Sequence, residues 1–502
     1  GIGRSRVLGV NFSRGHLVTM NRRAGAKDAG AFLYHMSSGR VAWPSDITYE
    51  GVFYGHYFSV PPTETDIVKV EFETCASKDP ISGKLDYFVS LGTSSKFDGT
   101  GLVKAGGRPP VHLMFVLDIS GSMGSLFYER SAKQLRGKVE EGGKSDGPPK
   151  TKMTAAIEAI CGLLDHLGEK DSFGLVVFDT KAETLLPLTS CTEEFRASAK
   201  AEVRKLKPRG GTNLSAGMTR AMEDIKDKTR AGESDHPHLH QRIFYLTDMN
   251  PNTGSSDTQS LLRLFREGAE SDPAVYSTVI GFGVDFNTDL TESFAKVRGL
   301  NYFSVHSPAE FLRQMTWDFD YLVFPIAFDV EVRVADDGAT GCKTLAMCGS
   351  PTPLADLNGA LMYTNTVFPS QTMGKDKGES KGAIFLAKVA LDDPAAPVHV
   401  ITTYRAYDGT THKSVAELRF PEIAGPGSPS IRKGVLLARY VALMKAYCGD
   451  YHLWSEEAGP SASKARGIDF SIDWNARNQT VRKAGKRIEA SDALYLPLFQ
   501  EF

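Results

Sequence analysis

The 502-residue sequence has no long apolar run and no excess of charge of either sign. No window approaches the roughly 18 consecutive apolar residues of a membrane-spanning helix, so we expect a soluble chain without membrane insertion. Its 58 basic and 60 acidic residues form no long block of one sign, so nothing indicates binding to nucleic acid or to an anionic membrane. The N-terminus lacks the apolar core of a signal peptide, but the chain begins with Gly1, which leaves open a leader removed before that residue.

Cysteine is also scarce, with six residues dispersed along the chain and no CxxC pair. This spacing indicates neither a zinc ribbon nor a small disulfide scaffold. Cys161 falls on the apolar face of a predicted helix, where we expect a buried free thiol. Cys342 and Cys348 are near enough in sequence to bridge a hairpin, and the spacing alone leaves that bridge open.

The chain is too long for a single core, since domains average about 150 residues. Residues 1–45 are rich in Gly, Arg and Lys and weakly patterned, as an extended N-terminal arm would be. Residues 46–110 contain short alternating runs such as "IVKVEFETC" and "LDYFVSLGT", which indicate β-strands. The cluster "KAGGRPP" then marks a domain boundary.

Residues 111–325 have a different pattern, in which apolar strands alternate with amphipathic helices. Almost continuous apolar runs, typical of strands covered on both faces, predict strands at 113–118, 173–178, 242–248 and 276–283. Apolar residues at helical spacing fill "TKMTAAIEAICGLLDHLG", and further helical patterns follow Thr192, Leu214, Ser256, Thr288 and Pro308. We therefore predict an α/β fold with a doubly wound, mainly parallel sheet, whose ligand site lies at the carboxyl ends of its strands.

The β pattern returns over residues 326–425, so two β-rich segments flank the α/β segment. The favoured interpretation is one β-sandwich built from 46–110 and 326–425, with the α/β domain inserted between them. Two separate small β domains are the alternative. Residues 426–502 turn helical, and "SIRKGVLLARYVALMKAY" has a broad apolar face that includes Val435, Leu436 and Val441.

Oxygen-bearing side chains gather where the predicted strands end. Asp118 closes the first strand, and Ser120 and Ser122 follow it in "DISGSM". Thr212 follows two glycines in "KPRGGTNLS", and Asp248 ends the strand in "LTDMNPN". Because parallel strands present their carboxyl ends at one sheet edge, these two carboxylates and three hydroxyls form an all-oxygen set. Hard divalent cations prefer such ligands, above all Mg²⁺, with Ca²⁺ or Mn²⁺ as alternatives.

These motifs resemble the von Willebrand factor type A domain, also called the integrin I-type domain. "DISGSM" fits the family's D-x-S-x-S signature, "GGTN" and "LTD" follow in the family's order, and "VIGFGVDFN" resembles its late strand. The resemblance covers roughly residues 111–325. It implies that Asp118, Ser120, Ser122, Thr212 and Asp248 form a metal-ion-dependent adhesion site, in which an acidic residue of a partner protein completes the metal coordination.

Two features beside the proposed ligands are candidates for partner choice. Met249 stands where the family commonly has glycine, which alters the rim without removing a ligand. Residues 124–150 form an unusually long polar interval, which is either a specificity loop or a tolerated surface insertion. Outside 111–325, the order of segments loosely resembles multidomain type A proteins such as inter-alpha-trypsin-inhibitor heavy chains, which implies architecture only.

Three other motifs are better explained by ordinary structure than by chemistry. "GGKS" has the wrong glycine spacing and no preceding strand for a phosphate loop. "DHPHLH" offers His236, His238 and His240 to a transition metal, but a solvated loop is the favoured interpretation. An aromatic run should pack against the β domain, with a partner surface as second choice; it comprises Trp317, Phe319, Tyr321 and Phe324.

The sequence therefore predicts a non-enzymatic binding, adhesion or scaffold protein that captures an Asp or Glu of another protein through Mg²⁺. The alternative is a structural subunit packed constitutively in a large complex, indicated by the Gly-rich arm and the tail "DALYLPLFQEF". An enzyme-accessory role rests only on exchangeable waters at a metal. No Ser, His and Asp set with catalytic context is apparent.

Overall fold

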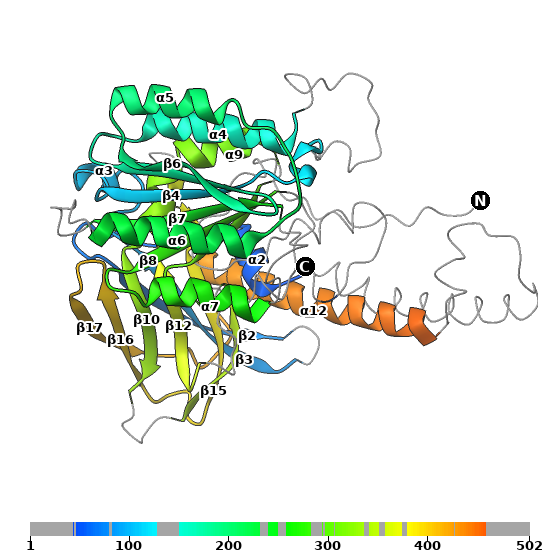
Figure 1. Ribbon diagram of the computed structural model, residues 1–502. Coiled ribbons are helices and arrows are strands. Elements are labelled where there is room, and N and C mark those ends of the chain that lie inside the picture. The colour runs from blue at the N-terminus through cyan, green and yellow to red at the C-terminus, as the bar shows by residue number, and fades with distance from the viewer. Residues whose placement is uncertain are drawn as a thin grey trace, which may run out of the picture.

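The structure is a computed structural model with an α/β part stacked on two β-sheets and a long C-terminal helix (Figure 1). It describes residues 44, 47–79, 83–127, 150–230, 239–248, 258–282, 294, 297–305, 307–335, 341–350, 357–373, 379–425 and 427–457. The predicted arm at 1–45, all but residue 44, lies outside these residues. So do positions 458–502 of the predicted helical region. Within the described residues, no helix is both long and apolar enough to cross a bilayer.

The α/β part is built on a six-stranded sheet with the order β6-β5-β4-β7-β8-β9. Its strands are β4 (Val111–Asp118), β5 (Ser172–Phe178), β6 (Ala182–Ser190), β7 (His240–Thr247), β8 (Val275–Phe282) and β9 (Asn301–Val305). Only β5 and β6 pair antiparallel, so the predicted mainly parallel α/β sheet is confirmed. The apolar runs missed β6, an edge strand in which exposed and buried residues mix around Pro187.

Helices cover both faces of this sheet (Figure 1). One face carries α4 (Lys152–His166), α5 (Glu193–Val203) and α9 (Pro308–Thr316), and the other carries α6 (Leu214–Arg230) and α7 (Thr258–Ala269). Side chains of β4 alternate between the two layers: Leu113 and Phe115 belong to the core with α4, while Met114 and Val116 pack with α6. This burial on both faces explains the unbroken apolar run of β4. The helix expected after Thr288 falls mostly outside the described residues.

Two four-stranded sheets form the β part, with the orders β12-β10-β16-β17 and β11-β15-β3-β2. Their strands are β2 (Lys69–Lys78), β3 (Leu85–Ser94), β10 (Ala327–Val334), β11 (Cys342–Cys348), β12 (Ala360–Val367), β15 (Ile384–Leu391), β16 (Val398–Ala406) and β17 (Thr411–Leu418). β3 pairs with β15 from Tyr87 to Gly92. Strands that precede and follow the α/β part along the chain therefore share one sheet.

Short elements complete the described chain. They are α2 (Tyr49–Tyr54), β1 (Tyr57–Ser59), α3 (Gly101–Lys104), η1 (Gly121–Gly124), α10 (Phe319–Val323), β13 (Thr372–Met373) and β14 (Glu379–Lys381). β1, β14 and β13 form a small third sheet. α2 is a helix within the segment expected to be β-rich, and it packs against α12 (Pro429–Glu457).

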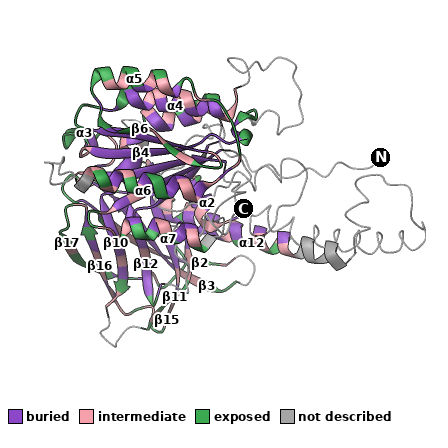
Figure 2. Ribbon diagram, viewed as in Figure 1, coloured by how far each residue is buried: buried purple, intermediate pink, exposed green. Residues whose placement is uncertain are grey.

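The helix α12 covers the outer face of the sheet that contains β15 (Figure 2). Phe385 and Ala387 of β15 belong to the core between the sheets, whereas Ile384 and Leu386 pack with α12. The predicted apolar face of α12 is buried at Val435 and Val441. The prediction that Leu436 belongs to the buried face is wrong, since this residue is 42% exposed.

None of the six cysteines, all of which lie within the described residues, forms a disulfide. Cys342 and Cys348 stand at the two ends of the seven-residue strand β11. At about 3.3 Å per residue they are roughly 20 Å apart, too far for a bridge. The structure therefore excludes the Cys342–Cys348 bridge that the spacing left open. Cys161 is half-buried rather than buried, because only part of its side chain faces the core.

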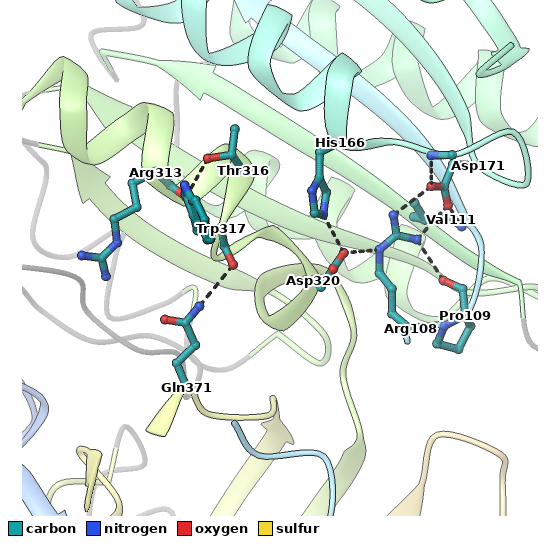
Figure 3. A network of polar contacts seen from close by, with 11 residues as sticks. Arg108, Pro109, Val111, His166, Asp171, Arg313, Thr316, Trp317, Asp320 and Gln371 are labelled. Carbon is teal, nitrogen blue, oxygen red and sulfur yellow. Dashed lines mark hydrogen bonds and ion pairs between the residues drawn. The ribbon is translucent and has the colours of Figure 1, made fainter. Parts of the chain in front are cut away.

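A polar network joins the two chain connections between the α/β part and the β part (Figure 3). Arg108, just before β4, donates to both carboxylate oxygens of Asp171 at 2.7 and 2.9 Å. Its Nε donates to Asp320 of α10 at 2.8 Å, and the same Asp320 oxygen lies 3.1 Å from His166 Nε2. Arg108 and Asp171 precede β4 and β5, so the network lies at the amino edge of the parallel sheet.

The aromatic run at residues 317–324 divides between packing and exposure. Phe324 packs edge-to-face against Phe97 and Tyr407, which lie outside the α/β part, as expected. Phe319 instead faces Phe244 within the α/β core. Trp317 is 81% exposed; its backbone N–H donates to the Arg313 carbonyl, and its carbonyl accepts from Gln371 at 3.1 Å (Figure 3).

Candidate functional site

The sequence-predicted ligands lie in loops at the carboxyl edge of the six-stranded sheet. Asp118 is the last residue of β4, Asp248 follows β7 directly, and Thr212 lies two residues before α6. β4 and β7 are neighbours, and the chain leaves them toward opposite ends of the sheet. This is the topological switch point, where the loops diverge and ligands bind in α/β sheets.

The loop after β4 holds the Asp118 carboxylate in a fixed position. Its Oδ1 accepts a hydrogen bond from the Ser120 backbone N–H at 2.8 Å. Its Oδ2 accepts one from the Thr247 hydroxyl at 2.8 Å, which connects β4 to β7. The hydroxyls of Ser120 and Ser122 lie 3.0 Å apart. Asp118 and Ser120 are buried, whereas Ser122 is exposed, so the site opens to solvent on the Ser122 side.

Backbone hydrogen bonds attach the Thr212 loop to the same place. The Arg209 N–H donates to the Ile119 carbonyl at 2.6 Å, and the Gly121 N–H donates to the Gly210 carbonyl at 3.2 Å. Gly210 has a φ of +69°, a left-handed conformation that favours glycine. A Cβ there would also lie 3.0 Å from the Asp179 side chain. The pair of glycines before Thr212 therefore lets this loop approach the β4 loop.

The two buried carboxylates place a concentrated negative charge at this edge. Burial raises the pKa of Asp118 to about 6; hydrogen bonds from Ser120 and Thr247 oppose the rise, and the charge of Asp248 adds to it. Such a group favours either a proton or a nearby cation. The sheet edge thus has the electrostatics of a cation site.

One cationic side chain that sequence reasoning missed contacts the site. Lys152, the first residue of α4, donates from Nζ to Oδ2 of Asp248 at 3.0 Å. The two side chains are 17% and 1% exposed. The sequence offered one signal, since a lysine in the first helical turn opposes the helix dipole and suggests a nearby acid.

The donor set fits a hard divalent cation. It consists of carboxylate and hydroxyl oxygens from three loops, and the Lys152 ammonium already places a positive charge against Asp248. Among the described residues, no group of three or more His, Cys, Asp or Glu side chains could hold a metal, so hydroxyls are needed beside the two carboxylates. Met249, residues 128–149 of the polar interval, and His236 and His238 lie outside the described residues.

A shallow hollow of about 390 Å³ adjoins the Thr212 loop between β6 and α6. It is lined by Asn213, which follows Thr212, and by Ala182, Ala216, Arg220 and Glu223 among others. Sequence reasoning did not find it, because the lining residues come from separate segments. The hollow therefore lies next to Thr212 in the sequence, at the start of α6.

The α/β part of the chain is similar to known sequences. Residues 113–252, which contain all five predicted ligands, match the sequence model of the von Willebrand factor type A domain. The chain therefore contains a von Willebrand factor type A domain, which the match places in the α/β part. Domains of this class generally serve in protein–protein interaction or adhesion.

The similar curated proteins include inter-alpha-trypsin inhibitor heavy chains. Heavy chain H2 of Sus scrofa is 27% identical over 179 residues, which cover 36% of this chain and 16% of that protein. Heavy chain H1 of Mesocricetus auratus is 25% identical over 230 residues, which cover 45% of this chain and 22% of that protein. The similarity thus spans less than a quarter of these relatives.

Among solved structures, a von Willebrand factor type A protein from Catenulispora acidiphila aligns with 87% of this chain and 90% of its own. The sequence identity is 15% and the TM-score is 0.42.

Proposed function

We propose that the type A domain binds a partner protein through a divalent metal ion held by Asp118, Ser120, Ser122, Thr212 and Asp248. Mg²⁺ is the preferred ion, with Ca²⁺ or Mn²⁺ as alternatives. The observation that carries the proposal is the pair of buried carboxylates beside the exposed Ser122 hydroxyl at the switch point of the sheet. When bound, the ion would supply a positive centre that attracts a carboxylate oxygen.

The chain's own residues would fix the geometry of this site. Ser120 N–H and Thr247 orient the Asp118 carboxylate, and the β7 backbone places Asp248 next to it. Ser122 lies on the solvent side, where an Asp or Glu of the partner would approach. The hollow lined by Asn213, Arg220 and Glu223 would supply further polar contacts. Residues 124–150 and Met249 remain the sequence-based candidates for partner choice.

Metal binding can be tested directly by calorimetric titration with MgCl₂ and MnCl₂. The wild type is expected to bind one ion, Asp118→Ala is expected not to, and Asp165→Ala is the matched control. Asp165 serves as the control because it is an aspartate of α4 whose side chain is 70% exposed. Equal binding by Asp118→Ala and Asp165→Ala would remove Asp118 from the site.

Carboxylate capture needs a second assay on the same proteins. Immobilised wild type should retain synthetic peptides with one Asp or Glu in Mg²⁺ buffer and release them in chelator. Peptides with Asn or Gln at that position are the control. Retention that survives chelator would instead support the second candidate function, a structural subunit packed constitutively in a large complex. Trp317 favours this candidate, because it is 81% exposed and tryptophan is enriched in protein interfaces.

We further propose that binding, not catalysis, is the role of this site. The Ser120 and Ser122 hydroxyls bond each other, and the Ser120 side chain is buried, which does not suit a nucleophile. Hydrolysis assays on phosphoester and peptide substrates with Mg²⁺ should give no turnover. Turnover that Asp118→Ala abolishes would contradict this and restore the enzyme-accessory alternative.

A further inference from the structure

The ammonium group of Lys152 contacts one of the proposed ligands directly. Nζ lies 3.0 Å from Oδ2 of Asp248, whose side chain is 1% exposed. The two residues are 96 positions apart in the sequence. The contact therefore crosses from the start of α4 to the loop after β7, over the carboxyl edge of the sheet.

The backbone holds Lys152 against the loop that carries Ser122. The Lys152 N–H donates to the Ser125 carbonyl at 3.0 Å, and the Phe127 N–H donates to the Lys150 carbonyl at 2.8 Å. Thr151 caps α4 by accepting from the Thr154 N–H, and Met153 is buried. These anchors fix the Lys152 Cα, so the side chain reaches Asp248 from a defined position.

The charge of Lys152 is not needed to stabilise α4 itself. A positive charge in the first turn opposes the helix dipole, and the first turn of α4 contains no acidic residue. Lys150, two residues earlier, is different because its ammonium bonds Glu158 of the same helix at 2.6 Å. The favourable partner of Lys152 is thus the site carboxylate.

We propose that Lys152 is a tethered internal cation that competes with the divalent metal for the Asp248 carboxylate and so lowers the metal affinity of the site. This inference rests on the proposed metal-dependent function. The ammonium offsets part of the buried negative charge when no metal is bound. A divalent ion at Asp248 must displace it or bear its repulsion, because two like charges then share one carboxylate.

Such a competitor has two effects of opposite sign. It stabilises the metal-free protein, since it neutralises a buried carboxylate, and it weakens metal binding. A lysine that merely supported the shape of the ligand loops would increase the metal affinity, so its removal would weaken metal binding. The sign of the change in metal affinity therefore separates competition from structural support.

The test compares Lys152→Met with wild type and with the matched control Lys150→Met. Each purified chain is titrated with MgCl₂ and MnCl₂ by calorimetry, and its thermal midpoint is measured in chelator and in saturating Mg²⁺. Lys152→Met should bind metal about tenfold more tightly than wild type, with a lower midpoint in chelator and a larger upward shift on adding Mg²⁺. Lys150→Met should keep the wild-type affinity. Lys152→Arg, which retains the charge, should stay near wild type even if Lys152→Met folds poorly.

The outcomes that overturn the inference differ from those that overturn the proposed function. If Lys152→Met binds metal as wild type does or more weakly, and wild type itself binds metal, the competition is contradicted. The proposed metal site is then unaffected. If Lys152→Met fails to fold, a Lys152→Arg affinity unlike that of wild type also overturns it. Absence of metal binding in every variant overturns both proposals.

Discussion

The two edges of the six-stranded sheet differ in how their buried carboxylates are stabilised. At the amino edge, Arg108 donates to both oxygens of Asp171 and also to Asp320, so one guanidinium is bonded to both carboxylates. At the carboxyl edge, Lys152 bonds Asp248, whereas burial and the neighbouring charge of Asp248 raise the pKa of Asp118 to about 6. The same sheet thus has one edge where an arginine stabilises the charged carboxylates and one where burial disfavours the charged form of Asp118.

The difference assigns different roles to similar aspartates. Burial alone would raise the pKa of Asp171, but the Arg108 guanidinium and backbone N–H groups hold it below its ordinary value. Asp118 has no arginine among the causes of its pKa shift, which is upward. A buried charge that destabilises the fold is common at functional sites, which supports the proposal of a binding site at this edge.

The largest expected effect comes from breaking the amino edge with Asp171→Asn. This change leaves the buried Arg108 without its bidentate partner, so the free energy of unfolding should fall by about 3–5 kcal/mol. Urea unfolding measures it, and Asp165→Asn, an exposed aspartate paired with Lys200, is the control. A loss no larger than that of the control would contradict the contrast between the edges.

A smaller effect is expected from acid, which should weaken the sheet through His112 near the amino end of β4. Burial lowers the pKa of His112 to about 4, and the charge of Lys228 adds to this. The unfolded chain binds a proton near pH 6.5, before the folded chain does, so stability is lost as pH falls from 6.5 to 4.

Replacing the histidine isolates its contribution. His112→Gln should reduce the acid loss of unfolding free energy by up to about 3 kcal/mol at pH 4 relative to wild type. Urea unfolding between pH 7 and pH 4 provides the comparison. Parallel pH profiles for the two proteins would show that His112 is not responsible.

At the carboxyl edge, Asp118→Asn should have the opposite sign to Asp171→Asn. In chelator at pH 7.5 it removes a buried charge next to Asp248 and keeps an acceptor for the Ser120 N–H, so unfolding free energy should rise by about 1–2 kcal/mol. Adding Mg²⁺ should stabilise the wild type but not the variant. Destabilisation in chelator comparable to that of Asp171→Asn would show that both edges are organised for stability.

The smallest expected effect on stability comes from a glycine in the loop before Thr212, at the carboxyl edge. Gly210→Ala should cost about 1 kcal/mol, because φ is +69° and the new Cβ meets Asp179 at 3.0 Å. Gly121→Ala is the control, since its Cβ would lie 3.6 Å from the Gly210 carbonyl oxygen, an ordinary contact. Thermal unfolding of both variants measures the difference. Equal midpoints would mean that the Thr212 loop tolerates rearrangement.

Much of the α/β part was predictable because each central strand is buried on both faces. That burial requires continuous apolar runs, and β4, β5, β7 and β8 were found from them. Strands with mixed burial, such as β6 and β11, gave no comparable signal. Leu436 was misplaced because a broad apolar face on α12 does not reveal which of its residues the sheet covers.

The sequence by itself determined the chemistry of the candidate site. Asp118, Ser120 and Ser122 lie within one short motif, and apolar runs show where the strands end. The candidate oxygen ligands and their position at one sheet edge therefore followed from local pattern. The tertiary structure alone decided how the charges are balanced. Arg108 meets Asp171 across 63 positions and Lys152 meets Asp248 across 96, and such contacts depend on chain topology that no local pattern contains.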